Sequence, residues 1–376
     1  MKFLIDRLAF RDALQRVEMA IDRKPTRPVL GGVVVQADNN SLIVLASDLD
    51  ISVRYRIDQV QVDEPGWALV PGRELVDVFK DIEADIVTVE LGGNNLFEIQ
   101  GGEDHCSLVT MENSTSSTGG PEGFPTVPTL DSDPHLRVEK SVFMQMVNST
   151  RFATSRVHDT RFATEGVLFE SDECDITMVG TDGRRLACIR RQAIEGSGKQ
   201  RSVLLPKMLD QIVRFGQDEQ GDTIDIFFMD NRVGFRIGNL ESFGRVLEGE
   251  FPSYVNVIPK EGKHVIRAHR ESMSRKLKFA SHLTADTAAV VRIEISHDQM
   301  KISAENEGRG RTDSTIEVDY TGGGLSASFN PGFLLDGLKA AHTDQVELMM
   351  DEGTKPAKLI LGDDYEYVVM PLSNYS

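Results

Sequence analysis

Apolar residues recur at helical spacing in three stretches of the chain. Residues 6–21, 139–153 and 270–283 each place apolar side chains at i, i+3 or i+4, and i+7. This spacing aligns the side chains along one face of a helix, while most intervening positions are polar. The pattern therefore predicts three amphipathic helices, each about one domain length from the next.

A second helical pattern follows each of these stretches, and it begins at a proline. The segments "ALVPGRELVDVFKDI", "VLLPKMLDQIVRFG" and "ASFNPGFLLDGLKAA" read as a short apolar strand, a proline and a helix. Proline is favoured in the first turn of a helix, where its missing N–H leaves no bond unmade. Pro71, Pro206 and Pro331 therefore mark three further helix starts, separated by 135 and 125 residues.

Between the helices, apolar runs alternate with polar turns. The turns include Asp38-Asn39-Asn40 and Ser171-Asp172-Glu173, and such clusters between apolar runs indicate β-hairpins. Each unit of roughly 125 residues thus reads helix, hairpins, proline-started helix, hairpins. Three such units fill the chain.

We therefore predict an α+β protein of three similar domains, 1–127, 128–255 and 256–376, each with two helices packed on antiparallel sheets. The motifs "GFPTVP" and "GEFPSYVNVIP" stand at the ends of the first two units. Residues 113–134 are rich in Ser, Thr, Gly and Pro, which is typical of a linker. Three unrelated α+β domains are the alternative interpretation.

The overall charge is acidic, with 41 basic and 59 acidic residues and a net charge of −18. Spread evenly, this charge would repel nucleic acid. Acidic runs such as "DECD" and "GDDYE" fall in predicted strands and turns, however, whereas basic residues gather on the predicted helices. The sequence thus favours an acidic protein with a basic surface built from helices, which includes Arg7, Arg11, Arg16, Lys140, Arg214, Arg267, Arg270, Arg275, Lys276, Lys278 and Lys339.

The three cysteines form no CxxC pair, which favours reduced thiols in a cytoplasmic protein. The N-terminus "MKFLIDRLAF" has no apolar run long enough for a signal peptide. No stretch approaches the ~18 apolar residues of a membrane span. We expect a soluble, cytoplasmic protein without a membrane partner.

Catalytic and metal-binding motifs are not found in the sequence. The glycine-rich "GRGR" and "TGGGLS" lack phosphate-loop spacing, the eight histidines form no HExxH, and there is no GxSxG. His105 beside Cys106 lacks the further ligands that zinc requires. We therefore expect no catalytic residue, metal or cofactor. A hydrolase with an unrecognised spatial triad and a repeat scaffold that binds proteins but not DNA are the alternatives.

Six motifs in this order resemble those of the bacterial DNA sliding clamp, the DNA polymerase III beta subunit, over the whole chain. They are "KPTRPVLGGVVV", "VPGREL", "TRFATEGVLFE", "TDGRRLA", "EGEFPSYVNVIP" and "YVVMPL". The resemblance implies the ring-forming DNA clamp fold: a head-to-tail homodimer that encircles double-stranded DNA without sequence preference. It also implies a non-catalytic processivity factor whose partners are the replicative polymerase, the clamp-loader ATPase and other proteins with a clamp-binding motif.

The resemblance assigns roles to particular residues. A groove between domains 2 and 3 would bind client peptides through Thr164, Thr181, Gly183, Arg185, Leu186, Pro252, Val257, Val368, Met370, Pro371 and Leu372. The DNA-facing residues would include Lys24, Arg73, Arg151, Arg156 and Lys207. The dimer interface would include Cys106, Leu108 and Leu283. The chain departs from the family in ending "MPLSNYS" and in placing "FA" before Thr164.

Overall fold

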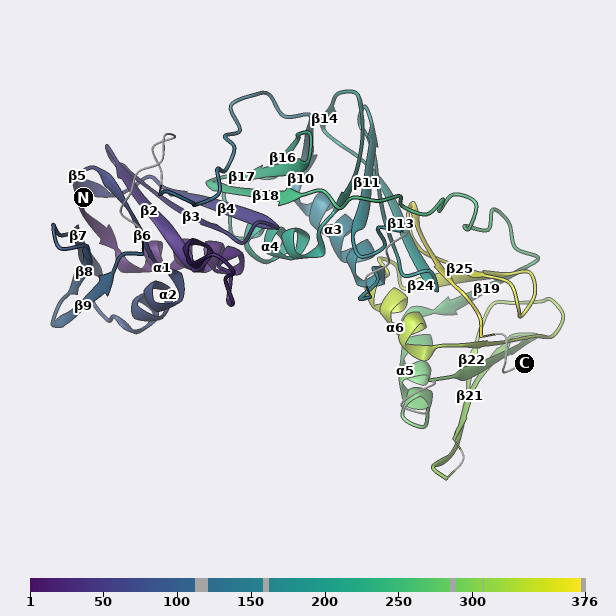
Figure 1. Ribbon diagram of the computed structural model, residues 1–376. Helices are drawn as coiled ribbons and strands as arrows, with labels where there is room; N and C mark the ends of the chain where they lie inside the picture. The colour runs from purple at the N-terminus through teal and green to yellow at the C-terminus, as the bar shows by residue number, and fades with distance from the viewer. Residues whose placement is uncertain (112–120, 158–161, 285–288, 307, 373–376) are drawn as a thin grey trace. The chain divides into compact units, whose positions relative to one another are not determined.

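A computed structural model describes residues 1–111, 121–157, 162–284, 289–306 and 308–372 (Figure 1). All six predicted helices are confirmed within these ranges. The first helix of each repeat is α1 (Arg7–Val17), α3 (Lys140–Thr150) or α5 (Arg270–Ser281). The proline-started helices are α2 (Gly72–Asp81), α4 (Pro206–Gly216) and α6 (Pro331–Ala340). Three short 3-10 turns are η1 (Glu18–Ala20), η2 (Pro28–Gly31) and η3 (Arg151–Ala153).

The strands also recur in three sets, here called repeats one, two and three. Repeat one contains β1 (Lys2–Asp6), β2 (Gly32–Asp38), β3 (Ser41–Ser47), β4 (Ile51–Ile57), β5 (Gln61–Glu64), β6 (Gly66–Pro71), β7 (Ile86–Leu91), β8 (Leu96–Gly101) and β9 (Asp104–Val109). Repeat two contains β10 (Leu136–Glu139), β11 (Val167–Asp172), β12 (Asp175–Thr181), β13 (Arg185–Gln192), β14 (Glu195–Gly196), β15 (Lys199–Leu204), β16 (Thr223–Phe228), β17 (Arg232–Ile237) and β18 (Leu240–Arg245). Repeat three contains β19 (His264–His269), β20 (Val291–Ser296), β21 (Gln299–Asn306), β22 (Gly310–Glu317), β23 (Leu325–Phe329), β24 (Gln345–Met350), β25 (Ala357–Gly362) and β26 (Tyr365–Val369).

Corresponding hydrogen bonds show that the three repeats share one plan. The N–H groups of Arg7, Lys140 and Arg270, at the first residue of each first helix, donate to the carbonyls of Asp85, Asp222 and Asp344 at 2.7–2.9 Å. The first hairpin of each repeat has the same two-residue loop, which sets the register between repeats. Position 41 therefore corresponds to positions 175 and 299.

The described residues form two compact units that cut across repeat two. One unit comprises residues 1–141 and 207–246, and the other comprises residues 142–206 and 247–376. Each unit thus joins one complete repeat to half of repeat two. The domain boundaries near residues 127 and 255 remain a prediction.

The first unit contains two sheets and the helices α1, α2 and α4. One sheet has the order β5-β1-β7-β8-β9, and the strands that this unit contributes to the other sheet have the order β10-β16-β17-β18-β4-β3-β2-β6. The helices α1 and α2 pack side by side (Figure 1). Phe10 of α1 lies edge-on to Phe3 and Phe79, with ring centroids 6.1 and 4.6 Å apart, and all three rings are fully buried. Aromatic packing between strand and helices thus forms this core.

The second unit repeats this organisation. Its larger sheet has the order β15-β11-β12-β13-β26-β25-β24-β19, its smaller sheet the order β22-β21-β20-β23, and α5 packs beside α6 (Figure 1). A Cβ added to Gly337 of α6 would lie 2.5 Å from the ring of Tyr367. Glycine therefore lets this helix approach the sheet closely.

Each unit is held together by a strand pair that joins two repeats. At junction one β4 pairs with β18, and at junction two β13 pairs with β26, both antiparallel over five residue pairs. The registers are equivalent, because the pair Tyr55 and Leu240 corresponds to the pair Ile189 and Tyr365. The strands β9 and β22, which correspond to these joining strands, are each the last strand at an edge of their sheet.

Candidate functional site

An apolar pocket of about 100 Å³ lies at junction two. Its walls come from three segments far apart in the sequence: the β12–β13 turn, the connector of residues 247–263, and β26. The structure brings together eight of the eleven groove residues expected from the sequence, namely Thr181, Gly183, Arg185, Leu186, Pro252, Val257, Val368 and Met370.

The β12–β13 turn is shaped by its own hydrogen bonds. The Thr181 hydroxyl donates to the carbonyl of Arg185 at 2.6 Å and accepts from the N–H of Gly183 at 3.2 Å. Asp182 Oδ1 accepts from the N–H groups of Arg184 and Arg185, both at 3.0 Å. Gly183 has a φ of 80°, in the left-handed region that favours glycine. The motif "TDGRR" thus encodes a rigid turn at the pocket rim.

Arg185 ties this turn to repeat three. Its guanidinium donates to Asp182 at 3.0 Å, to Asp336 of α6 at 2.6 Å and to the carbonyl of Phe152 at 2.9 Å. The same group lies 4.6 Å from the ring centroid of Phe333. Only 10% of the side chain is exposed. Its aliphatic stem therefore lines the pocket, and its guanidinium is bonded to the residues that form the pocket wall.

The pocket floor is apolar and preformed. Leu186 and Val368 face each other across the β13–β26 ladder and are 4% and 1% exposed. Met370 and Val257 form the rim and are 38% and 43% exposed, and the N–H of Met370 donates to the carbonyl of Arg184 at 2.9 Å. Exposed apolar rims above a buried apolar floor suit the burial of a partner's apolar side chain.

Three expected groove residues do not line this pocket. Thr164 is buried, and its carbonyl accepts from the N–H of Ser155 at 2.8 Å. Pro371 and Leu372 follow the rim, and the N–H of Leu372 donates to the carbonyl of Ser328 at 2.8 Å. They lie beyond the lining set.

Sequence reasoning missed Arg184, Ser253 and Tyr254, which also line the pocket. Tyr254 covers the outer face of β11–β13, and its hydroxyl donates to Glu170 at 2.6 Å. Burial and this hydrogen bond raise the pKa of Tyr254 above its ordinary value. The tyrosine inside the motif "FPSY" was the available signal.

Beneath Tyr254, Cys188 is fully buried in the same apolar cluster. Burial raises the pKa of the Cys188 thiol to about 12. All three cysteines are free in the structure.

The expected DNA-facing residues differ in how available their charges are. Lys24, Arg73 and Arg156 are exposed, and Arg151 is half-buried. Lys207 is ion-paired with Asp48. Basic residues outnumber acidic ones by 13 to 7 within the six described α-helices, whereas acidic residues outnumber basic ones by 59 to 41 in the whole chain. The helices are therefore locally basic.

One basic helix residue is used inside the fold. Arg16 of α1 is 12% exposed, donates to Glu219 at 2.5 Å and lies 4.8 Å from the ring centroid of Tyr55. Arg16 was expected to contribute to the basic surface, but it is part of an internal ion pair at junction one.

The expected interface residues lie near open sheet edges. Cys106 and Leu108 are half-buried on β9, and Leu283 is half-buried just after α5. Three large apolar side chains of repeats one and three are exposed: Val109 at 66%, Ile86 at 55% and Phe279 at 52%.

Within the described ranges, no group of three or more His, Cys, Asp or Glu side chains is placed to hold a metal ion. None of the helices described there is long and apolar enough to span a membrane.

Comparisons with known proteins agree with this architecture. The sequence matches the N-terminal domain of the DNA polymerase III beta subunit over residues 1–115, its central domain over 137–253 and its C-terminal domain over 255–373. It is 27% identical to the beta sliding clamp of Pseudomonas putida, over 99% of this chain and 100% of the relative, and 28% identical to that of Staphylococcus epidermidis, over 100% of both. The crystal structure of the DNA polymerase III subunit beta from Pseudomonas aeruginosa superposes with a TM-score of 0.90, at 25% identity, covering 99% of this chain and 100% of that one.

Three repeats of helices on antiparallel sheets, joined by equivalent strand pairs, define the three-domain DNA clamp fold. The chain belongs to the DNA polymerase III beta subunit family, and its function is that of a DNA sliding clamp. The alternative interpretations, a hydrolase or a scaffold unrelated to DNA, are not supported by these matches.

Proposed function

We propose that two copies of this chain close head to tail into a ring around duplex DNA and tether client proteins through the pocket at junction two, without catalysing a reaction themselves. The observation that carries this proposal is the repeated strand pairing. Two joining strand pairs are made inside the chain, and the third pair, β22 with β9, is left for a second copy. Heterologous contacts of this kind close into a ring when the rotation allows.

The two internal junctions predict the register of the third. When the repeats are aligned by their hairpins, Ser52, Leu186 and Arg311 correspond, as do Leu240, Tyr365 and Asp104. Applying the register of junctions one and two then sets Asp104 of one copy opposite Ser314 of the other. Cys106 would face Thr312, and Leu108 would face Gly310.

This register accounts for the exposed apolar side chains near the edges. A Cβ on Gly310 would lie 4.0 Å from Leu283, so Leu108 of the other copy would reach Leu283. On the helices, Phe279 occupies the position that Arg16 and Ser149 occupy in the other repeats. Arg16 contacts the loop after α4, and Ser149 contacts the loop after α6. Phe279 would accordingly contact the loop after α2, next to the exposed Ile86.

A disulfide cross-link tests this register. Opposed residues in an antiparallel pair have Cα atoms about 4.5–5.5 Å apart, within the range that a disulfide spans. Thr312→Cys should therefore form a covalent dimer with the native Cys106 under mild oxidation. Ser314→Cys, two residues out of register on the same strand face, is the matched control and should stay monomeric on a denaturing gel.

Cross-linked Thr312→Cys rings loaded on circular DNA should remain bound through denaturation, and linearising the DNA should release them. Cross-linking of the Ser314→Cys control instead, or retention on linear DNA, would contradict the proposal.

The DNA contact would be collective and independent of sequence. Lys24, Arg73 and Arg156 have exposed basic side chains suited to phosphate contact. Each phosphate contact adds salt-dependent affinity, with a slope of about 0.9 per contact. A ring retains DNA by topology, so a few weak contacts suffice and allow sliding.

One Ser–His contact in the described chain resembles part of a catalytic triad, and its geometry argues against that role. Ser149 Oγ lies 2.9 Å from His342 Nε2, but Ser149 is 1% exposed and its hydroxyl donates to the carbonyl of Gln145 at 2.8 Å. A buried hydroxyl bonded back to its own helix has no access to a substrate. The pair therefore supports a structural tie between repeats.

A further inference from the structure

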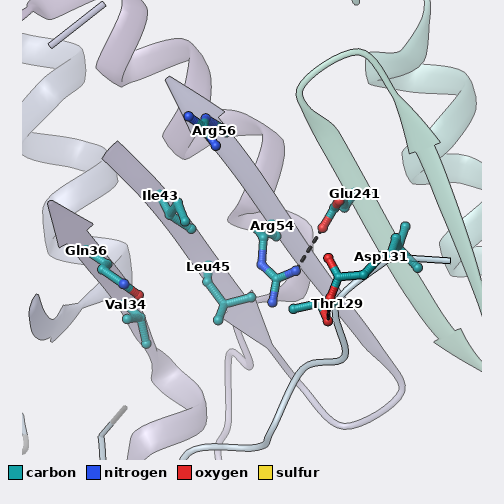
Figure 2. Close-up of a pocket in the computed structure, with 10 residues that line it drawn as sticks. Val34, Gln36, Ile43, Leu45, Arg54, Arg56, Thr129, Asp131 and Glu241 are labelled. Atoms are coloured by element: carbon teal, nitrogen blue, oxygen red, sulfur yellow. Dashed lines mark hydrogen bonds and ion pairs between the residues drawn. The ribbon is translucent and has the colours of Figure 1, made fainter. Parts of the chain in front are cut away.

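The outer face of the β2–β4 strands in repeat one carries a second pocket, of about 360 Å³. Figure 2 shows Val34 on β2 and Ile43 and Leu45 on the adjacent β3, with Arg54 of β4 directed toward Glu241 and with Thr129 and Asp131 opposite. All of these residues lie in the first unit. The volume is at the lower end of the range typical of small-ligand sites.

On the corresponding face of repeat two, two of the three positions are apolar and are covered by the chain itself, while Thr177 takes the position of Ile43. Val34 and Leu45 correspond to Leu168 and Val179, which are fully buried in a cluster with Tyr254. Gln36 corresponds to Glu170, which accepts the hydrogen bond from the Tyr254 hydroxyl. A tyrosine thus fills this site in repeat two, with its ring on the apolar residues and its hydroxyl on the polar one.

The corresponding face of repeat three is polar, and Arg292 on it is exposed. The positions of Val34, Ile43 and Leu45 are taken there by Arg292, Lys301 and Ser303, and the neighbouring Asp313 pairs with Lys301 at 2.9 Å. A face that meets water is therefore built from polar and charged side chains in this protein.

Repeat one combines the apolar residues of repeat two with the open face of repeat three. Val127 stands at the position of Tyr254 after the Phe-Pro motif, and with Leu130 it packs toward Phe227 and Phe243 on β16 and β18. In residues 121–135, the connector between repeats one and two, the apolar side chains of Val127 and Leu130 thus pack toward β16 and β18. Arg54 and residues 129–131 line the pocket where repeat two has its tyrosine, and Ile43 and Leu45 remain half-buried.

We propose that this pocket binds a tyrosine side chain from a segment of a protein partner that lies outside its helices and strands. The ring would pack on Val34, Ile43 and Leu45, and the hydroxyl would hydrogen-bond to Gln36, as Tyr254 does with Glu170. Arg56, 57% exposed at the rim, would lie beside the ring, where a guanidinium is attracted to an aromatic face. A segment outside helices and strands is the presentation that fits, because Tyr254 itself lies in one, just before a turn in which the N–H of Val257 donates to its carbonyl.

The test uses the full-length protein with labelled Ile, Leu and Val methyl groups, and N-acetyl-tyrosinamide as the probe. The probe should shift the methyl resonances of Val34, Ile43 and Leu45, with saturation in the millimolar range. N-acetyl-phenylalaninamide, which lacks the hydroxyl, should bind about fivefold more weakly, since a neutral hydrogen bond contributes roughly that factor. Gln36→Leu should abolish the difference between the two probes.

Ile43→Lys provides the blocking variant, because repeat three carries a lysine at this position without loss of the fold. It should eliminate the shifts of Val34 and Leu45, whereas Met370→Ala, in the other pocket, should leave them unchanged. Shifts confined to Leu186 and Val368, equal binding of the two probes to the unmodified protein, or unchanged binding to the Ile43→Lys variant would each overturn the proposal.

Discussion

Junctions one and two share a backbone plan but are fastened by different chemistry. On the outer face, Arg54 and Glu241 form a cross-strand ion pair at 2.8 Å, and Arg54 also donates to the carbonyls of Val127 and Pro128. The position of Arg54 is taken by Cys188 at junction two, beneath Tyr254. One connector is therefore held by a charged side chain and the other by apolar burial.

The same contrast holds on the helix side. At junction one, Arg16 and Glu219 form an ion pair, and at junction two the corresponding contact joins Ser149 and His342. The repeated backbone thus accepts either ionic or neutral fastening. The side chains determine where a pocket forms. At junction one the pocket lies on the sheet of repeat one, and at junction two it lies beside β26.

The largest expected effect comes from removing the apolar cover. Tyr254→Ala should lower the free energy of unfolding of the second unit by about 3 kcal/mol, because it empties a buried aromatic site and removes the hydrogen bond from the Tyr254 hydroxyl to Glu170, which keeps its ion pair with Arg201. Urea denaturation with hydrogen exchange of β11–β13 measures this loss. Val127→Ala is the matched change in the other connector and should lower stability by about 1 kcal/mol. Equal losses would show that the two connectors are fastened alike.

A smaller effect is expected on client binding. Met370→Ala should weaken binding of a labelled C-terminal peptide of the cognate replicative polymerase by about tenfold, or ~1.4 kcal/mol, since it removes one wall of the apolar pocket. Fluorescence anisotropy gives the affinity, and a sizing run checks the dimer. Ile43→Lys should leave this affinity unchanged. A loss of client-peptide affinity in the Ile43→Lys variant would instead place the client at junction one.

Next in size is the difference between two lysines. The two turn aspartates are alike: Asp48 Oδ1 and Asp182 Oδ1 each accept two turn N–H groups, and the second oxygen of each holds a cation. Since Asp48 already pairs with Lys207, Lys207→Ala should change the salt dependence of DNA affinity less than Lys24→Ala, for which the slope should fall by about 0.9. Asp48→Asn keeps the turn and should increase DNA affinity. A larger change from Lys207→Ala would refute this.

The smallest effect concerns pH. Partial burial, and secondly the charge of Arg191, lower the pKa of His342 below 6.5, and its ring stacks on Tyr365 at 5.1 Å. Near pH 6 the unfolded chain therefore binds more protons, so stability present above pH 6.5 is lost as the pH falls. Urea denaturation of the second unit at pH 7.5 and 5.5 should show this loss, and His342→Gln should reduce it. An unchanged pH dependence in the variant would exclude His342 as the cause.

Much of this organisation could be predicted from the sequence, because amphipathic spacing, the three prolines and the hairpin turns are local signals. The residues of the junction-two pocket were found through motifs, since Gly183 and Pro252 leave recognisable patterns. The ion pairs of Arg16 and Lys207 were not predicted. The local sequence pattern around a basic helix residue is the same whether the side chain faces solvent or pairs with a carboxylate far away in the sequence. The pocket of repeat one depends on which strands the apolar side chains of the connector contact, and no local sequence pattern encodes these contacts.

The shortness of the joining strand pairs has a mechanical consequence. Each junction has five residue pairs whose hydrogen bonds run perpendicular to the strands. In a ring closed by an equivalent pair between β22 and β9, even tension around the circumference would load all of these bonds together. A force applied at one end of the strands would instead break them one after another, like a zipper. Such a strand pair resists even tension but opens progressively when it is pulled from one end. A protein that opens the ring would therefore need a force applied in the right place and direction more than a large force.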